Sequence, residues 1–420
     1  MLAGLAVALI GFIGMGRAQV GIPELFPFNK ENMALIKIAG GYNFDNDEFL
    51  DIVGIAALVD EKGKPIPRSS YIVHFEESAS KDLIVQWKFA VPKDMKADFS
   101  DILVTDIDSD GLPEIVSALN ISDIGRSTRT DWLYIFEYDN GFPTKPTATM
   151  DGAGNFVTRP RPLFLHCGDI DGNKVPDIVI SSGGPERRVV VISANGPVSS
   201  ENLEIIYHVN KISTLEGTLP FKAVAANVDY STGDELVIFG GNNTLHVDVY
   251  INEVPDPVLK HSFQDIPRWD FDLARLAIGD LDGDGLEEFI IPLKSGGTIL
   301  MSRQGEEFIS KRFLPKEQNI AALLITDYNS NGLGEITYNT QGGATLFNLE
   351  YDMSGDLTDS DFYRHICYDN PVLKGFQFID IAPVLSASGK YTGSIIMPFL
   401  NNNYNKHGLC GWQLEDVTPL

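Results

Sequence analysis

The sequence predicts an all-β fold, a seven-bladed β-propeller of four-stranded antiparallel blades with calcium-binding hairpin loops. Three observations lead to this fold class. An acidic nine-residue loop recurs six times, with first positions at residues 43, 106, 169, 227, 280 and 327. Short apolar runs of strand length flank the loops, and Asn-Gly or similar turns follow in several repeats. Because successive copies are 47 to 63 residues apart, each repeat has room for one blade.

The repeated loop carries oxygen-bearing side chains at positions 1, 3, 5 and 9 and an apolar side chain at position 7 in its five better copies. Oxygen atoms at alternate positions of a tight turn can converge on one hard cation, and Ca²⁺ accepts six to eight of them. Position 7 contributes its backbone carbonyl in this scheme. The candidate ligands are Asn43, Asp45, Asp47, Phe49 and Asp51; Asp106, Asp108, Asp110, Leu112 and Glu114; Asp169, Asp171, Asn173, Val175 and Asp177; Asp280, Asp282, Asp284, Leu286 and Glu288; and Asp327, Asn329, Asn331, Leu333 and Glu335.

The loop differs from the calcium loop of an EF-hand. An EF-hand requires glutamate at position 12 and a helix on each side. Position 12 is Ile291 in the copy that starts at residue 280 and Ser117 in the copy that starts at residue 106. Glycine at position 6 (Gly111, Gly285, Gly332) suits a sharp turn with positive φ. The loop is therefore predicted to be the turn of a β-hairpin.

The copies differ in their number of carboxylates, which orders their expected affinities. At the four side-chain positions there are four carboxylates in the 280 and 106 loops and three in the 43 and 169 loops. The 327 loop and the sixth, worn copy (Asn227, Asp229, Ser231, Glu235) have two each. Such crowding of like charges is unfavourable without a cation, so about four to six Ca²⁺ ions are expected. The alternative is that these are ordinary turns, in which Asp, Asn and Gly are favoured for backbone reasons alone.

Each repeat is expected to contain four strands in a fixed order. The first precedes the loop, as at Ile102–Thr105, Leu163–His166, Ala274–Ile278 and Ala322–Thr326. The second follows it, as at Ile115–Val116, Ile178–Ile180, Leu236–Ile238 and Phe289–Ile291. A second hairpin supplies the third and fourth strands, as where Tyr134–Tyr138 runs into Asn140 and Gly141. The strand, acidic loop, strand and second hairpin together define one blade.

A seventh unit is visible near the end of the chain. Phe376–Ile381, Ser394–Pro398 and Leu409–Leu414 align with the first, second and third strands of the other repeats. The expected loop between the first two, Ala382–Gly393, has no carboxylates, so no metal is predicted there. Because this unit is one strand short, residues 20–30 are expected to supply the missing strand and to close the ring.

The N-terminal residues are interpreted separately from the propeller. A short apolar stretch and small residues before position 19 predict a signal peptide over residues 1–18. The stretch lacks a preceding Lys or Arg, and a buried strand or a short membrane anchor are the alternatives. Residues 19–420 then form a single propeller without an integral membrane segment. The expected location is secreted, periplasmic or at the cell surface.

Composition limits the partners. With 58 acidic and 32 basic residues the formal net charge is −26, which argues against nucleic acid as a ligand. Three cysteines are too few for a disulfide framework. Cys367 and Cys410 are the candidate pair, and buried free thiols are the alternative.

The D-x-D-x-D-G-x-x-D/E hairpin and the apolar strand after it resemble the FG-GAP/VCBS repeat, the propeller of integrin α subunits and of many bacterial secreted proteins. The resemblance covers roughly residues 30–400 and is specific at five loops. It implies a secreted, calcium-binding module for adhesion or binding, with an extracellular or periplasmic protein or glycan as partner. Departures from the pattern are Asn43, Asn227, Ser231 and the seventh loop.

The sequence shows no Gly-x-Ser-x-Gly, His-Glu-x-x-His or phosphate-binding motif. His166 beside Cys167 is interpreted as a strand residue, and no catalytic residue is predicted. The alternatives to a binding module are a carbohydrate-active enzyme similar to propeller polysaccharide lyases and an assembly component of the cell envelope.

Overall fold

A computed structural model of the chain describes the following residues: 24–27, 33–45, 47, 49–62, 64–79, 83–93, 95–121, 131–151, 162–182, 188–209, 220–251, 258–316, 318–341, 345–353, 357–369, 376–385, 391–401 and 406–413. The predicted signal peptide lies outside these residues. No helix among the described residues is long and apolar enough to cross a membrane.

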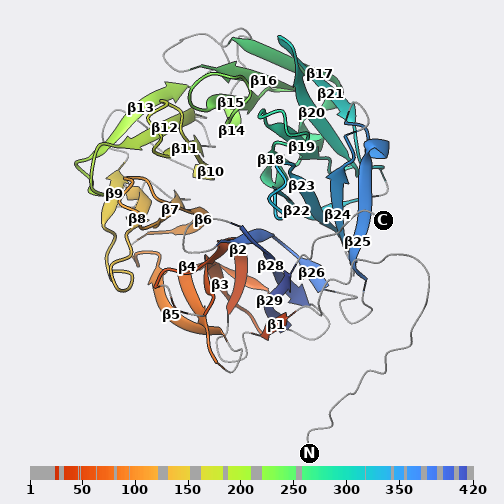
Figure 1. Cartoon of the computed structure of the whole chain (residues 1–420). Helices are drawn as coiled ribbons and strands as arrows, with labels where there is room; N and C mark the ends of the chain where they lie inside the picture. The colour runs from red at the N-terminus through yellow and green to blue at the C-terminus, as the bar shows by residue number, and fades with distance from the viewer. Residues whose placement is uncertain are drawn as a thin grey trace, which may run out of the picture.

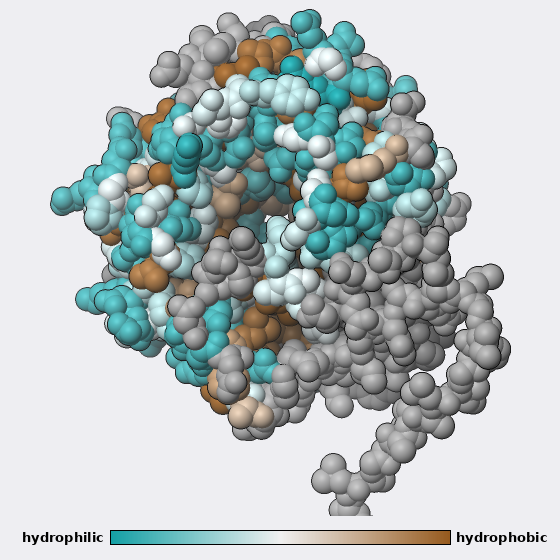
Figure 2. Space-filling view, in the orientation of Figure 1, coloured by the Kyte–Doolittle hydropathy of each residue, from teal (hydrophilic) through white to brown (hydrophobic). Residues whose placement is uncertain are grey.

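β-sheets follow one another around a ring (Figure 1), and hydrophilic residues cover much of the face seen in the same orientation (Figure 2). Five sheets have four antiparallel strands each, in sequence order from the centre outward. Their strands are β6 (Ala97–Thr105), β7 (Glu114–Ile121), β8 (Asp131–Phe136) and β9 (Ala148–Asp151); β10 (Pro162–Gly168), β11 (Asp177–Ser182), β12 (Arg188–Ala194) and β13 (Leu203–Val209); β14 (Pro220–Ala226), β15 (Glu235–Gly240), β16 (Thr244–Tyr250) and β17 (Leu259–Pro267); β18 (Ala277–Gly279), β19 (Glu288–Pro292), β20 (Thr298–Gln304) and β21 (Glu307–Arg312); and β22 (Ile320–Thr326), β23 (Glu335–Thr340), β24 (Thr345–Tyr351) and β25 (Phe362–Asp369). The 3₁₀ helices η2 (Arg268–Asp270) and η3 (Leu273–Arg275) precede β18, and η4 (Asp359–Asp361) precedes β25.

The remaining sheet joins the two ends of the chain. It comprises β1 (Glu24–Pro27), β2 (Met33–Tyr42), β3 (Asp51–Val59), β4 (Pro65–Glu77), β5 (Leu83–Ala90), β26 (Phe376–Phe378), β27 (Ala382–Leu385), β28 (Tyr391–Asn401) and β29 (Lys406–Gln413). A single parallel pairing of Gly41 with Val384 joins β2 to β27. β1 pairs antiparallel with β29, with Glu24 opposite Gly411. The predicted pairing of an N-terminal strand with the last repeat is therefore confirmed, and it closes the ring.

One predicted boundary in the last repeat is wrong. The expected loop Ala382–Gly393 contains a strand, because β27 pairs with β28 through Ala382 and Ile396. The expected first strand is interrupted after β26, where the carboxylate of Asp380 accepts the backbone N–H of Ile38 at 3.0 Å. Pairing with β28 and contact with β2 thus determine where β26 and β27 begin and end. The contact with β2 joins residues far apart in the sequence.

The hydrophobic core lies between neighbouring sheets. All six residues of β15, a second strand, are buried, because the adjacent sheets cover both of its faces. The rings of Phe239 on β15 and Phe289 on β19 are 5.9 Å apart between centroids. The outer strand β5 instead alternates between partly buried and exposed residues. Burial of each large side chain stabilises the fold by about 1.5–3 kcal/mol.

Polar side chains of the inner strands connect each sheet to the next. Ser181 Oγ accepts the N–H of Ala223 at 2.8 Å, which joins the β10–β13 sheet to the β14–β17 sheet. Lys222 Nζ donates to the carbonyl of Leu273 at 2.6 Å, and so reaches the next sheet. Arg275 Nε donates to the carbonyl of Ala321 at 2.7 Å one sheet farther on. These hydrogen bonds fix the rotation between sheets and hence the relative positions of the acidic loops.

Candidate metal centres

Each acidic loop connects the first and second strands of its sheet, as predicted. The residue at position 9 begins the second strand and lies opposite the last residue of the first. Thr105 pairs with Glu114, and Gly279 pairs with Glu288. A two-stranded ladder therefore brings the start and the end of every loop together, and its carboxylates must share a small volume.

The carboxylate at position 9 organises all six loops in the same way. Each of these residues is at most 3 % exposed. One carboxylate oxygen accepts the backbone N–H of position 2 at 2.7 to 3.0 Å. The pairs are Phe44 with Asp51, Ile107 with Glu114, Ile170 with Asp177, Val228 with Glu235, Leu281 with Glu288 and Tyr328 with Glu335. The second oxygen of each carboxylate remains for another partner.

Alternate side chains also shape the backbone within the loop. In the 280 loop, Asp280 accepts the N–H of Gly285 at 2.9 Å, and Asp284 accepts that of Leu286 at 2.8 Å. Gly285 has φ +86°, and Gly111 and Gly332 at the same position have similar values. In these three loops the glycine at position 6 adopts positive φ, as predicted. Lys174 occupies this position in the 169 loop with φ +72°, where it pays a steric cost that glycine avoids.

Three loops bring carboxylates from positions 1, 3 and 9 together. In each, one oxygen from each of the three side chains lies within 4.8 Å of the other two. The sets are Asp106, Asp108 and Glu114; Asp169, Asp171 and Asp177; and Asp280, Asp282 and Glu288. These donors are hard oxygens, the type that Ca²⁺ selects.

The 106 loop contains a buried carboxylate oxygen without a hydrogen-bond partner among the described residues. Glu114 is 0 % exposed, and no described group donates a hydrogen bond to its Oε1. Asp177 Oδ1 is similarly placed in the 169 loop, although the nearby Ser193 hydroxyl favours its ionised form. An unsatisfied buried acceptor costs about 1–3 kcal/mol, and more if it is charged. A cation among the three carboxylates would satisfy this oxygen, so the residues fit a bound metal ion.

The pKa values reflect the same crowding. Burial raises the pKa of Glu114 to about 8, and the neighbouring Asp108, Asp106 and Asp110 raise it further against a backbone hydrogen bond. Burial likewise raises the pKa of Glu288 to about 9, with added repulsion from Asp282 and Asp284. A carboxylate with so high a pKa is held ionised at neutral pH only by a compensating positive charge.

The 327 and 227 loops provide hydrogen-bond donors of their own. Asn329 Nδ2 donates to Glu335 Oε1 at 2.6 Å, and Ser231 Oγ donates to Glu235 Oε1 at 2.7 Å. In the 227 loop, the guanidinium of Arg303 lies 3.9 Å from Asp229 Oδ2 and donates to the carbonyl of Val228 at 2.5 Å. The second oxygen at position 9 is therefore satisfied by protein in both loops.

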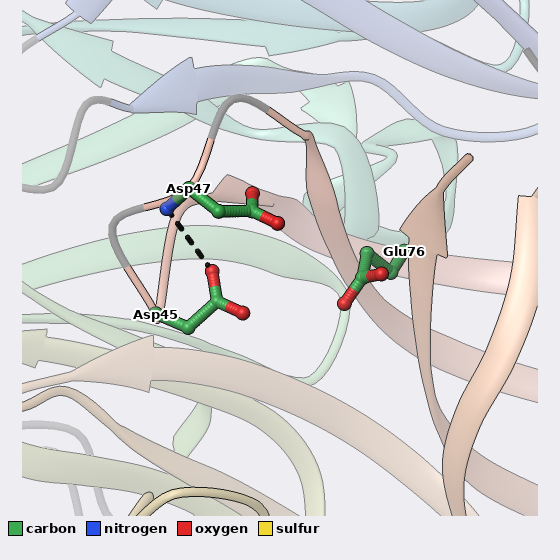
Figure 3. Close-up of side chains that lie close together, drawn as sticks. All are labelled: Asp45, Asp47 and Glu76. Atoms are coloured by element: carbon green, nitrogen blue, oxygen red, sulfur yellow. Dashed lines mark hydrogen bonds between the residues drawn. The ribbon is translucent and has the colours of Figure 1, made fainter. Parts of the chain in front are cut away.

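The first loop is arranged differently from the sequence expectation. Its position 9 residue, Asp51, is 2.7 Å from His74 Nε2, and both side chains are buried. Glu76 on β4 instead lies close to Asp45 and Asp47 (Figure 3). Glu76 pairs with Asp51 across β3 and β4. Sequence reasoning missed Glu76 because only the register of that hairpin reveals its position.

Backbone hydrogen bonds connect neighbouring loops. The N–H of position 8 in one loop donates to the carbonyl of position 1 in the preceding loop. Asp234 donates to Asp169 at 2.6 Å, Glu287 to Asn227 at 2.7 Å and Gly334 to Asp280 at 2.6 Å. No sequence pattern singled out position 8, yet these bonds couple the 169, 227, 280 and 327 loops.

The titratable side chains near the ring centre serve inter-sheet contacts. Asp101 pairs with Lys37 and accepts the N–H of Leu165 at 2.8 Å. His166 Nδ1 accepts the N–H of Ala225 at 3.2 Å, and burial lowers the pKa of His166 to about 4. His166 is therefore on a strand, as predicted. Cys167 is a free thiol, whereas the side chains of Cys367 and Cys410 lie outside the described residues.

Comparison with known proteins identifies the fold. No protein-family model and no curated protein matches the sequence. The β-propeller domain of Cps50 (Swd1) from Myceliophteria thermophila is similar, with TM-score 0.50 and 8 % identity over 94 % of this chain and 100 % of that domain. BBS1N in complex with ARL6DN gives TM-score 0.53 and 9 % identity over 96 % of this chain and 100 % of that one. The chain is therefore an all-β protein with a β-propeller fold, as predicted.

Proposed function

We propose that this chain is a calcium-stabilised, seven-bladed β-propeller of the FG-GAP/VCBS type, which acts outside the cytoplasm as a binding module for a protein partner. The seven-blade interpretation divides the nine-stranded sheet at the single pairing of Gly41 with Val384. One part is then the β2–β5 blade. The other is a blade made by β26 to β29 and completed by β1.

The observation that carries the calcium proposal is the geometry around Glu114. Its buried Oε1 lacks a donor among the described residues, and one oxygen of this carboxylate lies within 4.8 Å of oxygens of Asp106 and Asp108. Three carboxylates converge in the same way in the 169 and 280 loops, and in the 169 loop Asp177 Oδ1 is again buried without a donor among the described residues. A divalent cation would neutralise the three carboxylates and hold the start and end of each loop together. Asp106, Asp108 and Glu114, with their equivalents in those two loops, would hold the ions.

The remaining loops form a graded series. Asp45 and Asp47 of the first loop, with Glu76, offer a more exposed site in which Glu76 replaces Asp51. The 327 and 227 loops have internal donors, so we assign them the weakest affinity. This order of expected affinities differs from the order of the carboxylate counts only for the first loop, because Asp51 is paired with His74 there.

The test is thermal unfolding of residues 19–420 in millimolar Ca²⁺ and in EGTA, with bound ions counted by native mass spectrometry. A calcium-dependent rise in Tm together with at least three bound ions supports the proposal. An identical Tm in both buffers and no bound ion would refute it. The acidic loops would then be ordinary turns.

The binding role rests on the fold and on the arrangement of its loops. BBS1N, a structural neighbour, is described as a complex with ARL6DN. Lys37, Lys222 and His166 near the ring centre are engaged in contacts between sheets, so their geometry favours a scaffold. No observation on the described residues singles out a catalytic set, and we therefore prefer binding to the enzyme alternative.

A further inference from the structure

The face opposite the acidic loops carries a line of cationic and aromatic side chains. We call it the cation–aromatic strip. It consists of Phe221, Arg268, Trp269, Lys294, Arg312 and Lys316. These residues precede or begin first strands, lie in the turn between second and third strands, or end a fourth strand. In an antiparallel blade those positions are at the end opposite the loop between the first and second strands. The strip and the candidate metal centres are thus on different faces.

The members of the strip are in contact from one sheet to the next. The guanidinium of Arg268 lies over the ring of Phe221, 5.1 Å from its centroid. Lys294 Nζ donates to the carbonyl of Trp269 at 3.1 Å. Beyond Lys294, a hollow of about 370 Å³ is lined by Ser295, Arg312, Phe313, Leu314, Pro315 and Lys316. The strip therefore extends from the start of β14, across the β18–β21 sheet, to the start of β22. These three sheets follow one another around the ring in Figure 1.

The backbone beneath the strip is fixed by hydrogen bonds between loops. Lys294 N–H donates to the carbonyl of Asp270 at 2.7 Å, and Gly297 N–H donates to that of Gln318 at 2.7 Å. The carboxylate of Asp270 accepts both the N–H and the hydroxyl of Ser295, at 2.8 and 2.7 Å. Gly296 has φ +99° and is so close to the carbonyl of Lys316 that a Cβ would overlap it. Such a surface is preorganised, which reduces the entropy lost on binding.

Exposure and charge indicate what binds there. Trp269 is 65 % exposed, although burial of a large apolar side chain is favourable. Lys294, Arg312 and Lys316 are also exposed, on a chain whose formal net charge is −26. Tryptophan and arginine are the residue types most enriched among those that dominate binding energies. The strip combines both with cations that have a long-range attraction for acidic groups.

We propose that the cation–aromatic strip binds a short acidic peptide segment of a protein partner, with an apolar side chain of the peptide against Trp269 and its carboxylates on Lys294, Arg312 and Lys316. A short segment meets only the strip. A long polyanion such as nucleic acid or an acidic polysaccharide would extend beyond the strip over a protein whose formal net charge is −26 and be repelled. The proposal rests on the binding-module part of the proposed function and is independent of calcium.

The test measures fluorescence anisotropy of a short fluorescein-labelled peptide of alternating glutamate and leucine, added to the full chain at fixed Ca²⁺. The matched probe contains glutamine in place of glutamate, and polygalacturonate represents an acidic polysaccharide. The variants are Trp269→Ala and the double charge reversal Lys294→Glu with Lys316→Glu. The controls are Lys145→Glu and Tyr230→Ala, which change exposed residues outside the strip.

We expect the acidic peptide to bind, the glutamine peptide to bind at least about tenfold more weakly, and both strip variants to lose about tenfold in affinity. The two controls should change affinity by less than about twofold. Binding that the strip variants leave unchanged, or no binding at all, overturns the proposal. Tighter, strip-dependent binding of polygalacturonate also overturns it and assigns a glycan ligand. The calcium-dependent Tm of the same samples reports separately on the metal centres, so the two proposals fail distinguishably.

Discussion

Replacement of Glu114 by glutamine isolates one candidate metal centre. Glutamine keeps an oxygen to accept the N–H of Ile107, which Glu114 Oε2 accepts at 2.9 Å. It removes the negative charge at Oε1, the buried oxygen without a donor. In EGTA at pH 7 the change should be small, because burial raises the pKa of Glu114 to about 8 and the wild-type side chain is then mostly protonated. In Ca²⁺ the variant should lose one ion.

The magnitude follows from linkage. One site with free Ca²⁺ at about 100 times Kd stabilises the native state by about 2.7 kcal/mol. An unfolding entropy of about 2.1 cal/mol/K per residue gives about 0.9 kcal/mol/K for the 420-residue chain. Loss of the site should therefore lower Tm in Ca²⁺ by about 3 °C and leave Tm in EGTA nearly unchanged.

Glu335→Gln is the matched control. Glu335 occupies the same loop position and is also buried, but Asn329 already donates to its Oε1 at 2.6 Å. Scanning calorimetry in both buffers, with ions counted by native mass spectrometry, gives the difference between the variants. If Glu114→Gln retains the wild-type ion count and the full calcium-dependent rise in Tm, the assignment of Glu114 as a metal ligand is wrong.

Three further predictions concern pH and the contacts between sheets. In EGTA, Tm should fall as pH rises from about 5 to 9. In the folded protein the pKa is about 8 for Glu114 and about 9 for Glu288, above the value of 4.5 for an ordinary glutamate. Both side chains therefore stabilise the fold while they are protonated, and this contribution is lost as they ionise. Ca²⁺ should offset this loss, and a calcium effect on Tm that is independent of pH would contradict the reasoning. Gly334→Ala should lower the free energy of unfolding in urea by about 1–3 kcal/mol, because the new Cβ would lie 2.7 Å from the carbonyl oxygen of Asp280. Gly285→Asn is the control: a Cβ at Gly285 has no neighbouring atom within 4 Å, so the loss of stability should be clearly smaller. Asp101→Asn should destabilise the folded protein by about 1–3 kcal/mol, because it removes the carboxylate that pairs with Lys37. An unchanged urea midpoint would show that this ion pair does not hold the sheets together.

Local turn chemistry made the acidic loops predictable. Asp, Asn and Gly at fixed positions act on backbone groups a few residues away, as where Asp284 accepts the N–H of Leu286. Glycine at position 6 was predictable for the same reason, because the positive φ it adopts is a property of the turn itself. Strand order around each loop followed from apolar runs of strand length, and the period of the repeat indicated the ring. The calcium assignment, the secreted location and the family resemblance remain predictions that the proposed experiments test.

Register and packing determined what the sequence pattern left open. Asp51 matches the loop pattern, but its carboxylate lies 2.7 Å from His74 Nε2 on β4. Glu76, which is the residue opposite Asp51, lies close to Asp45 and Asp47 instead. Arg303 is 75 residues from Val228 in sequence, yet it donates to its carbonyl beside Asp229. Neither contact is visible in a single-repeat pattern, because each depends on which residues of another strand come opposite the loop.

The β-propeller class, the order of strands within the repeats and the positions of the six acidic loops could be predicted from the sequence, because hydrogen bonds and turn preferences act over a few residues. The tertiary structure decided which loops leave a carboxylate oxygen such as Glu114 Oε1 without a donor, and which, like the 327 loop, supply their own. It also decided that Arg268, Trp269, Lys294 and Lys316 lie along one face. These features could not be predicted because burial and contacts between sheets depend on how separate repeats pack around the ring.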